Sequence, residues 1–556
     1  MNITYKNTLK LDFNERSDNP PAWLDPITIA NSTLWSYPDK SLLEKIICQQ
    51  LVIDKEQLLI TNGGDEAIEL LFKSAKINSS DVILPLPAFS QYIQAETSWR
   101  LRLNKVDSND DLTINIDATR RCIKKAKSGD IVIITSPNNP TGETLSLQVI
   151  KQLCADAKQA GVIVFLDQAY IEFTEQAQQS LELIDEFNNL IVLRTLSKAY
   201  GLAAIRIGYM LGNKQLISNF KNIALPFNNS QPSIDLAKIA FTKKAQLEII
   251  SYRKVIAANR KTITNYLQQK QLQLVESEAN FILITGNTLK LRLIKAACAK
   301  NNIDIKTGLI GLSINQQLDA IRISIPHNIE RLTLALKIAL EPMLVCFDMD
   351  GVLINTQKSY DQSTIETVAF FTGQRISNDE IKQLRNSAGF NNDWKLTRQL
   401  IKRRGMKVSL EEVINKFQEY YQGTKKTTGF KLNEIPLIED RNRQKFFIQK
   451  SRTLKTAVVT GRPLAEAKQG LELLGIKNTL LISDDDVINS KPDPEGVIKA
   501  KQYYKADSCW LIGDSADDML AACKAGAIAI GIGDKGLMDF GADLVLESVN
   551  QLGELL

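Results

Sequence analysis

The chain has 556 residues, a formal net charge of +5 at pH 7, and a composition of 44% hydrophobic and 24% charged residues. These values predict a globular protein with several cores, and the small positive excess, without a Lys/Arg block, does not indicate nucleic-acid binding. The N-terminal stretch "MNITYKNTLKLDFNERSD" lacks the apolar segment of a secretory signal, and no run reaches the roughly 18 apolar residues of a membrane-spanning helix. We therefore expect a cytoplasmic protein with neither nucleic-acid nor membrane partners.

Histidine and cysteine usage limits the chemistry further. The seven cysteines are scattered and lack metal-site spacing, so we expect reduced thiols buried in the core. His327 is the only histidine, which argues against a His-dependent triad or a site of several histidines, and we interpret it as a loop residue. Catalysis must therefore use Lys, Asp, Tyr, Arg and backbone groups.

Short apolar runs alternate with segments of helical periodicity through the first 240 residues. The runs at 81–87, 130–137, 161–170 and 190–198 are typical of strands that end in polar residues. This alternation predicts an α/β fold with a mainly parallel sheet covered on both faces. Ligands bind at the carboxyl ends of the strands in such sheets, so the polar residues that follow these runs are the first candidates for a site.

The pattern changes near residue 240. A long helical segment at 243–269 precedes strand-like runs at 281–285 and 320–326 and a helix at 328–340, which together predict a smaller α+β domain. A second α/β pattern begins after Pro342. It is interrupted from about 357 to 450 by a polar, helix-rich insert, and it resumes at "LKTAVVTGRP".

The strand ends of the first half hold the side chains that an aldehyde cofactor needs. Two glycines precede a helix in "TNGGDEAIELLFKSA", where free N–H groups bind anions, and Lys198 follows a strand. A lysine amine forms a Schiff base with pyridoxal phosphate (PLP), and a carboxylate such as Asp167 keeps the ring nitrogen protonated. Taken singly, each of these motifs is also typical of an ordinary turn or helix cap.

Taken together, these motifs carry a resemblance. With "LWSYPD", "GGDEAIELL", "PAFSQY", "SPNNPTG", "DQAY", "TLSKAYGLAAIRIGY" and "AIRIS" in this order, residues 1–342 resemble a fold-type I PLP-dependent aminotransferase, most closely the histidinol-phosphate aminotransferases. The resemblance implies the PLP-transferase fold, with a large PLP domain at about 35–240. A small α+β domain would comprise the N-terminus and about 241–342.

The resemblance also implies roles for individual residues. Lys198 would form the Schiff base and move the substrate's proton, and Asp167 would pair with the pyridinium nitrogen. Substrate would contact Asn14, Lys306 and Arg322. The tyrosine that matches Tyr37 reaches in from the neighbouring subunit in this family, which implies a homodimer. The other implied cofactor contacts are Phe89, Asn139 and Tyr170 at the ring and Tyr37, Gly64, Asp65, Thr195, Ser197 and Arg206 at the phosphate.

The sequence departs from the family pattern at three positions. Gln168 replaces a glutamate, Lys306 replaces the second anion-binding arginine, and Arg16 stands where a proline is usual. The residue at 168 is no ring contact in the family, so we expect Gln168 to have little effect. The N-terminal arm also looks short. A lysine lacks the two-pronged geometry of a guanidinium, so substrate identity is less well supported than PLP binding.

The second α/β pattern opens on "VCFDMDGVLINT", which places Asp348 and Asp350 just past a strand. Of two such carboxylates, one can attack phosphorus while the other protonates the leaving oxygen, provided that a cation offsets their repulsion of phosphate. Further polar residues follow later runs: Thr460 in "VVTGRP", Lys491 in "NSKPDP", and Asp514 and Asp518 in "WLIGDSADDMLAACKAG".

With these four motifs, residues 343–556 resemble the phosphatases of the haloacid dehalogenase superfamily, which implies a Rossmann-like domain with a helical cap at about 357–450. Asp348 would be the nucleophile and Asp350 the general acid–base. Thr460 and Lys491 would hold the phosphoryl oxygens. Mg²⁺ would be held by Asp348, the Asp350 carbonyl, Asp514 and Asp518. The segment 388–405 is a candidate substrate reader through Asn391, Asn392, Lys395 and Arg398, although such a segment is more typical of a solvated cap helix.

Three functional hypotheses follow. The first is a bifunctional enzyme that transaminates a histidinol-phosphate-like compound, with glutamate and 2-oxoglutarate as the amino-donor pair, and hydrolyses its phosphoester, as consecutive steps of histidine biosynthesis would require. The second keeps both chemistries on another phosphorylated amino compound, including decarboxylation of the threonine-phosphate kind. The third is a phosphatase with a non-catalytic PLP-fold module, against which the presence of Lys198 and Asp167 argues.

Overall fold

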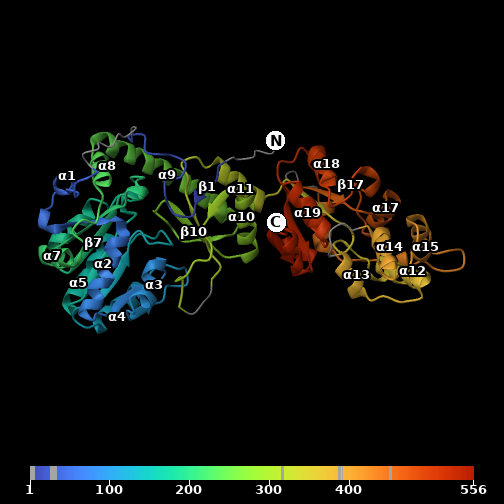
Figure 1. Cartoon of the computed structure of the whole chain (residues 1–556), viewed down its shortest axis with the longest axis horizontal. Coiled ribbons are helices and arrows are strands. Elements are labelled where there is room, and N and C mark those ends of the chain that lie inside the picture. The colour runs from blue at the N-terminus through green and yellow to red at the C-terminus, as the bar shows by residue number, and fades with distance from the viewer. Residues whose placement is uncertain (1–6, 25–33, 315–317, 386–389, 391, 450–453) are drawn as a thin grey trace. The chain divides into compact units, whose positions relative to one another are not determined.

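The computed structural model describes residues 7–24, 34–314, 318–385, 390, 392–449 and 454–556. By the contacts among its residues the chain divides into two compact units, residues 7–291 with 302–332 and residues 292–301 with 333–556. Each unit contains one large sheet (Figure 1). The domain boundary near residue 342 and the division of the first half at about 240 stay predictions.

Seven strands form the large sheet of the first unit, in the order β2-β8-β7-β6-β5-β3-β4. Strand β8 is antiparallel to β2 and β7, whereas the ladders that join β7, β6, β5, β3 and β4 are parallel. This confirms the predicted mainly parallel sheet. The strands are β2 (Leu58–Asn62), β3 (Val82–Pro85), β4 (Leu103–Val106), β5 (Ile131–Thr135), β6 (Ile163–Asp167), β7 (Leu190–Thr195) and β8 (Ile207–Gly212).

Helix α5 (Leu147–Ala160) illustrates how local sequence sets the helix ends around this sheet. The Ser146 side chain accepts the Val149 N–H at the N-cap, and Gly161, at φ 71°, ends the helix in the left-handed conformation. Its buried residues recur with helical spacing: Ile150, Leu153, Cys154 and Ala157. The other helices here are α1 (Ser41–Leu51), α2 (Gly63–Asn78), α3 (Ser90–Ser98), α4 (Ile116–Lys125), α6 (Leu183–Glu186), α7 (Lys214–Ile223) and α8 (Gln231–Ala240).

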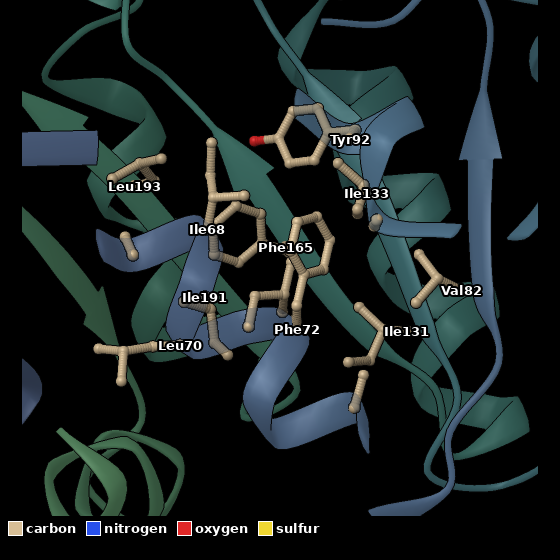
Figure 2. Close-up of a cluster of buried hydrophobic side chains, with 14 of the residues drawn as sticks. Ile68, Leu70, Phe72, Val82, Tyr92, Ile131, Ile133, Phe165, Ile191 and Leu193 are labelled. Carbon is tan, nitrogen blue, oxygen red and sulfur yellow. The ribbon is translucent and has the colours of Figure 1, made fainter. Parts of the chain in front are cut away.

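A hydrophobic cluster fixes α2 against the large sheet (Figure 2). Helix α2 supplies Ile68 and Phe72, and the strands supply Ile131 and Phe165. Tyr92 of α3 belongs to the same cluster and is fully buried. Because α2 begins at the carboxyl end of β2, this packing also holds the N-terminus of α2 at the edge of the sheet where ligands are expected.

Smaller sheets complete the first half of the chain. Strands β12 (Ile321–Ser324), β10 (Phe281–Thr285) and β9 (Gln273–Leu274) form an antiparallel sheet, and β1 (Leu9–Leu11) pairs in parallel with β11 (Ile303–Ile305). The helix predicted at 243–269 is α9 (Lys243–Gln269). Helices α10 (Thr288–Lys300) and α11 (Glu330–Leu340) also belong to this part of the sequence.

The second unit contains a six-stranded parallel sheet in the order β17-β16-β13-β18-β19-β20. Strand β13 lies between β16 and β18, so the carboxyl ends of these three strands meet at one edge of the sheet. The elements are β13 (Leu344–Phe347), β16 (Lys455–Val459), β17 (Leu480–Ile482), β18 (Cys509–Gly513), β19 (Ile528–Ile532), β20 (Leu544–Leu546), α17 (Leu464–Leu473), α18 (Glu495–Tyr504), α19 (Ala516–Lys524) and α20 (Leu552–Leu555).

A helical insert follows β13, as the sequence predicts for a cap. Strands β14 (Ile354–Asn355) and β15 (Ile435–Pro436), which lie before and after most of the insert, pair with each other in antiparallel orientation. The insert has a hydrophobic cluster of its own, in which Val368, Ile381, Leu400 and Val413 are buried. Its helices are α12 (Gln362–Thr372), α13 (Asn378–Arg385), α14 (Asp393–Arg403), α15 (Leu410–Gln422) and α16 (Asp440–Arg443).

One sequence-based prediction needs correction. Not all cysteines are buried: Cys48 and Cys122 are half-buried and Cys523 is exposed, because each lies on a helix face turned at least partly to solvent. The remaining four are buried, and all seven are free. Within the described residues, no helix is both long and apolar enough to cross a membrane.

Candidate active sites

Asp167 ends strand β6 and is buried. Its Oδ2 accepts a 2.7 Å hydrogen bond from the Tyr92 hydroxyl, and its Oδ1 accepts the Ala169 N–H at 2.9 Å. Burial raises the pKa of Asp167, although both hydrogen bonds favour its charged form. The carboxylate therefore sits where a cationic partner, such as a protonated ring nitrogen, would stabilise it.

Lys198 lies in the loop that follows β7. Its Nζ donates a 3.0 Å hydrogen bond to the Phe13 carbonyl and lies 5.6 Å from the centre of the Tyr170 ring. The Lys198 charge also acts on Asp167, whose carboxyl pKa it lowers. The amine and the buried carboxylate are thus close enough to interact electrostatically, and their shared role in one site stays a prediction.

Several residues predicted to hold a phosphate form a chain of contacts that ends at the N-terminus of α2. Arg206 donates to Asp65 Oδ2 at 2.6 Å and to Ser197 Oγ at 3.5 Å, and the Thr195 hydroxyl donates to Ser197 Oγ at 2.9 Å. The first N–H groups of a helix have no partner inside the helix, so those at Gly64 and Asp65 are available to an anion. A Cβ on Gly63, which has φ +68°, would lie 2.3 Å from Arg206 Nη2. Only glycine lets the arginine come this close.

Arg322 lies on β12, and its side chain is buried. It donates to Asn139 Oδ1 at 2.6 Å and to the Asp12 carbonyl at 2.5 Å. Its Nε is buried and has no hydrogen-bond partner among the described residues. Lys306 and Arg322 exchange both backbone hydrogen bonds across an antiparallel bridge, which places their side chains on the same face. Two cationic side chains thus stand together where substrate was predicted.

Asn14 is also at this site. It is buried, has φ 58°, and its Nδ2 donates to the Tyr170 hydroxyl at 3.1 Å. Its Oδ1 accepts a 2.9 Å hydrogen bond from the Ser324 hydroxyl. These contacts fix both Asn14 and Tyr170 relative to β12.

Two further predicted cofactor contacts are aromatic. Phe89 precedes α3 and packs edge-on against Tyr92, with ring centroids 6.2 Å apart. Tyr37 is 79% exposed and stacks on Phe227, with ring centroids 4.3 Å apart. A tyrosine with this exposure is free to contact a second copy of the chain, but the contact itself stays a prediction.

Two departures from the family pattern have clear structural roles. The Arg16 side chain is 1% exposed, pairs with Glu248 at 2.6 Å and lies 3.8 Å from the centre of the Tyr252 ring. It therefore ties the N-terminal segment to α9. Gln168 accepts hydrogen bonds from Arg194 at 3.1 Å and from the Ser180 hydroxyl at 3.2 Å, which agrees with the prediction that it is no ring contact.

The residues present fit PLP. A buried carboxylate at a strand end suits the ring nitrogen, and the glycine-lined helix start with Ser197 and Arg206 suits the phosphate. The partnerless Nε of Arg322 has hydrogen-bonding capacity left for an anionic substrate group.

In the second unit, Asp348 follows β13 and is buried. Lys491 Nζ donates to Asp348 Oδ1 and to Asp518 Oδ1, both at 2.7 Å. Burial raises the pKa of Asp348 to about 7, although Lys491 opposes this shift. Asp518 is also fixed by Ser515, whose hydroxyl donates to its Oδ2 at 2.6 Å. The predicted nucleophile and phosphate-binding lysine are thus in direct contact.

Asp348, Asp514 and Asp518 form a group of carboxylates whose ligand atoms lie within 4.8 Å of one another. Burial and the charges of Asp348 and Asp518 raise the pKa of Asp514 well above its usual value. A Cβ on Gly351, at φ +69°, would lie 1.8 Å from Asp514 Oδ2, so this glycine permits the close approach. Clustered carboxylate oxygens are the ligands that Mg²⁺ prefers, and these residues fit such an ion.

Asp350 pairs with Arg462, whereas Asp348 pairs with Lys491. Asp350 Oδ1 accepts hydrogen bonds from Arg462 Nε at 2.8 Å and Nη2 at 2.5 Å, and the Asp350 side chain is 28% exposed. Thr460 is buried at the end of β16, and its hydroxyl oxygen accepts the Arg462 N–H at 3.2 Å. Thr460 and Lys491 line one cavity, while Asp348, Asp350 and Asp514 line another beside it.

The cap contributes to both cavities. Tyr360, Arg385 and Trp394 line the cavity that contains the aspartates, and Lys395 lines the other, while Asn392 lines both. Arg398 is exposed, and Asn391 lies outside the described residues. Two of the four predicted cap candidates therefore face the site, but their roles stay predictions.

The sequence reasoning missed several residues of these sites. Tyr92 lies inside a quoted motif, but its hydrogen bond to Asp167 joins positions 75 residues apart. Arg462 follows Thr460 in "TGRP", where only the threonine was selected. Arg385 pairs with Asp361 at 2.8 Å and Asp393 at 2.7 Å. The signal available for Arg462 was its place directly after a strand end.

Comparison with known proteins agrees with this division. Residues 30–336 match the family Aminotransferase class I and II, and residues 345–532 match the family Haloacid dehalogenase-like hydrolase. The chain belongs to the class I and II aminotransferases, and a haloacid dehalogenase-like hydrolase domain follows in the same chain. It is thus an enzyme with a PLP-dependent transaminase part and a hydrolase part.

Two relatives and one solved structure illustrate what the first half is similar to. The chain is 33% identical to histidinol-phosphate aminotransferase of Clostridium botulinum strain Hall over 309 residues, which cover 54% of this chain and 84% of the relative. It is 29% identical to the enzyme of that name from Prosthecochloris aestuarii over 282 residues, 50% of this chain and 77% of the relative. The crystal structure of the Clostridium acetobutylicum histidinol-phosphate aminotransferase superposes with a TM-score of 0.52 at 21% identity, covering 59% of this chain and 97% of that one. The last likeness supports the fold.

Proposed function

We propose that the chain is a bifunctional enzyme: an aminotransferase for a phosphorylated amino compound of the histidinol-phosphate type, and a Mg²⁺-dependent phosphatase for the same class of compound. The observation that carries the proposal is the presence in one chain of two sites for anionic groups. One has Arg322 and Lys306, which are paired across two strands, and the other has Lys491 beside Asp348. The named relatives of the first half support the substrate class.

The aminotransferase site divides its work among this chain's side chains. Bound PLP supplies an aldehyde that condenses with amines and a ring that accepts the electrons of the substrate Cα–H bond. Asp167 holds the proton on the ring nitrogen, and Ser197, Arg206 and the start of α2 hold the phosphate. Lys198 Nζ removes the Cα proton and returns it at the other end of the transfer. Arg322 and Lys306 bind the anionic group of the substrate and orient it.

The phosphatase site works through a covalent intermediate. A carboxylate oxygen of Asp348 attacks phosphorus, the bond to the alcohol oxygen breaks, and Asp350 donates a proton to the departing alcohol. Asp350 then removes a proton from water, which attacks phosphorus, so that phosphate leaves and Asp348 is regenerated. Lys491 and Thr460 hold phosphoryl oxygens in both steps. Asp348, Asp514, Asp518 and the Asp350 carbonyl would hold Mg²⁺, whose charge offsets that of phosphate.

Assembly and location form part of the proposal. The 79% exposure of Tyr37 supports a homodimer in which this tyrosine reaches the partner's PLP site. The seven free cysteines support a reducing compartment, the cytoplasm. Glutamate and 2-oxoglutarate are the proposed amino-donor pair.

Lys306 favours a second candidate. A lysine in place of the family's arginine offers a point charge without a two-pronged geometry, so another phosphorylated amino compound, or decarboxylation in place of transamination, fits the site as well. A panel of phosphorylated amino compounds, assayed together for amino transfer, phosphate and carbon dioxide, separates these functions. Transfer and phosphate release with histidinol phosphate, and no carbon dioxide, support the first candidate. Activity on another compound of the panel in its place, or carbon dioxide release, supports the second.

A further inference from the structure

A buried arginine connects Asp350 to the base of the cap. The Arg462 side chain is 1% exposed, and it contacts Asp350 Oδ1 through Nε at 2.8 Å and Nη2 at 2.5 Å. The contact of Nε with Asp350 Oδ2 is longer, 3.2 Å. Oδ1 is therefore held by two short charge-assisted bonds, and Oδ2 is the oxygen left for proton exchange with a leaving group.

The adjacent edge of the guanidinium, formed by Nη1 and Nη2, is held by Glu434. Nη1 donates to Oε2 and Nη2 to Oε1, both at 3.1 Å, and the Glu434 side chain is 6% exposed. Glu434 directly precedes β15, the strand by which the chain returns from the cap. A buried guanidinium needs its charge balanced, so its orientation depends on both carboxylates.

Glu434 is in turn fixed by both ends of the cap. Its Oε1 accepts hydrogen bonds from the Tyr421 hydroxyl at 3.0 Å and from the Ser359 hydroxyl at 3.2 Å. Tyr421 lies near the end of α15, and Ser359 lies at the start of the cap. A continuous network thus runs from the cap through Glu434 and Arg462 to Asp350.

We infer that Arg462 and Glu434 are positioning residues that aim Asp350 Oδ2 at the leaving oxygen, and that the cap sets this aim through Tyr421. The inference rests on the proposed function, in which Asp350 is the general acid–base. If the network only held the cap to the sheet, its loss would affect all phosphoesters alike. If it aims the acid, its loss matters most for esters whose alcohol must be protonated in order to leave.

The test compares two aryl phosphates of similar shape. Phenyl phosphate must expel phenoxide, a basic leaving group whose conjugate acid has a pKa of about 10, the value for a tyrosine side chain. The p-nitrophenyl ester expels the much less basic p-nitrophenoxide, which leaves without protonation. The kcat/KM for each ester is measured on the full chain with Mg²⁺, since this quantity includes the departure of the alcohol. The variants are Glu434→Gln, Tyr421→Phe and Asp350→Asn, with Glu380→Gln as control. Glu380 lies on α13 and pairs with Arg404, and neither residue belongs to this network.

Asp350→Asn should lower kcat/KM for phenyl phosphate by about 10²–10⁴-fold, the usual contribution of a general acid, and affect the nitrophenyl ester much less. Glu434→Gln should show the same selectivity with about a tenfold loss, and Tyr421→Phe a smaller loss of the same kind. The control should match the wild type on both esters. The melting temperature and the retained aminotransferase activity show whether each variant folds. If Glu434→Gln does not fold, Tyr421→Phe still tests the network, because it removes only a hydroxyl.

The outcomes that contradict the inference are distinct from those that contradict the proposed function. Suppose that Asp350→Asn is selective, but Glu434→Gln and Tyr421→Phe either lower kcat/KM for both esters equally or lower it for neither. The inference is then wrong, and Asp350 remains the general acid. If Asp350→Asn itself shows no selectivity, Asp350 is not the acid and the proposed phosphatase mechanism fails first.

Discussion

The Tyr92 hydroxyl donates a 2.7 Å hydrogen bond to Oδ2 of Asp167, and both side chains are buried. Tyr92 comes from α3 and Asp167 from the end of β6, so the bond joins a helix to the central part of the large sheet. Asp167 sits in a hydrophobic surrounding that raises its pKa, and this hydroxyl opposes the shift. The tyrosine therefore helps to keep Asp167 ionised for the ring nitrogen of PLP.

Replacing Tyr92 by Phe removes this one hydrogen bond. A bond to a charged group contributes about 1.5–3 kcal/mol, so we expect a loss of about tenfold or more in the rate of amino transfer. The absorbance of bound PLP should titrate at a shifted pH. The Tyr209→Phe variant, which lacks another buried hydroxyl of the same sheet, should leave that titration unchanged. An unshifted titration in Tyr92→Phe would show that the hydroxyl has only a packing role.

Lys198→Ala tests whether the first half is catalytic. Loss of the amine removes both the covalent attachment of PLP and the proton carrier, and general acid–base catalysis alone contributes about 10²–10⁴-fold. Amino transfer should fall by at least that factor, and borohydride treatment should no longer leave a reduced PLP adduct on the chain by mass spectrometry. Hydrolysis of p-nitrophenyl phosphate should be unchanged. If amino transfer persists at the wild-type rate, the first half is a non-catalytic PLP-fold module or uses another residue.

Glu172 predicts a pH dependence of stability in the first unit. It is buried, its Oε2 has no partner among the described residues, and burial raises its pKa to about 7, against the opposing charge of Arg194. Between its unfolded pKa of about 4.3 and the folded value, the folded chain holds a proton that the unfolded chain has released. The free energy of unfolding therefore falls as pH rises through this window, by about 1.4 kcal/mol per pH unit, and is flat above it.

The Glu172→Gln variant removes this titration with little change of shape. Its melting temperature should be close to the wild-type value near pH 5 and clearly higher at pH 8. Glu182→Gln, which changes an exposed carboxylate, is the control and should track the wild type at both values. An equal difference between Glu172→Gln and wild type at pH 5 and pH 8 would contradict the prediction.

Asp514→Asn tests the proposed Mg²⁺ site. The variant removes one carboxyl group from a cluster of three in which Asp348 and Asp518 are buried and Asp514 is half-buried. It relieves their mutual repulsion, so in the absence of metal its melting temperature should be at least that of the wild type. The stabilisation that Mg²⁺ adds to the wild type should shrink, because it depends on the ratio of free metal to the dissociation constant. Calorimetric titration measures the weaker binding directly. Chelation by EDTA should abolish wild-type phosphate release, and added Mg²⁺ should restore it.

Much of the fold could be predicted because hydrophobic periodicity is local. The helix at 243–269 and the strands that end at Asp167 and Thr195 lie where the pattern places them. The antiparallel direction of β8 had no such signal, since periodicity does not encode strand direction.

The site residues likewise include some that the sequence could predict and some that it could not. Lys198, Asp167, Asp348 and Asp350 could be selected because each follows an apolar run at a strand end. Tyr92 and Glu434 could not, because their roles depend on partners that are brought together only in the folded chain. Arg16 looked like the loss of a family proline, yet it is a buried ion-pair partner of Glu248. A one-dimensional pattern contains no information on such pairings.

The central claim is that one chain carries out amino transfer and phosphate release on the same class of compound. The most direct measurement incubates the full chain, with PLP and Mg²⁺, with histidinol phosphate and 2-oxoglutarate, and follows glutamate and inorganic phosphate in the same sample. We expect both products, with glutamate alone lost in Lys198→Ala and phosphate alone lost in Asp348→Asn. The appearance of neither product with the wild-type chain would contradict the claim.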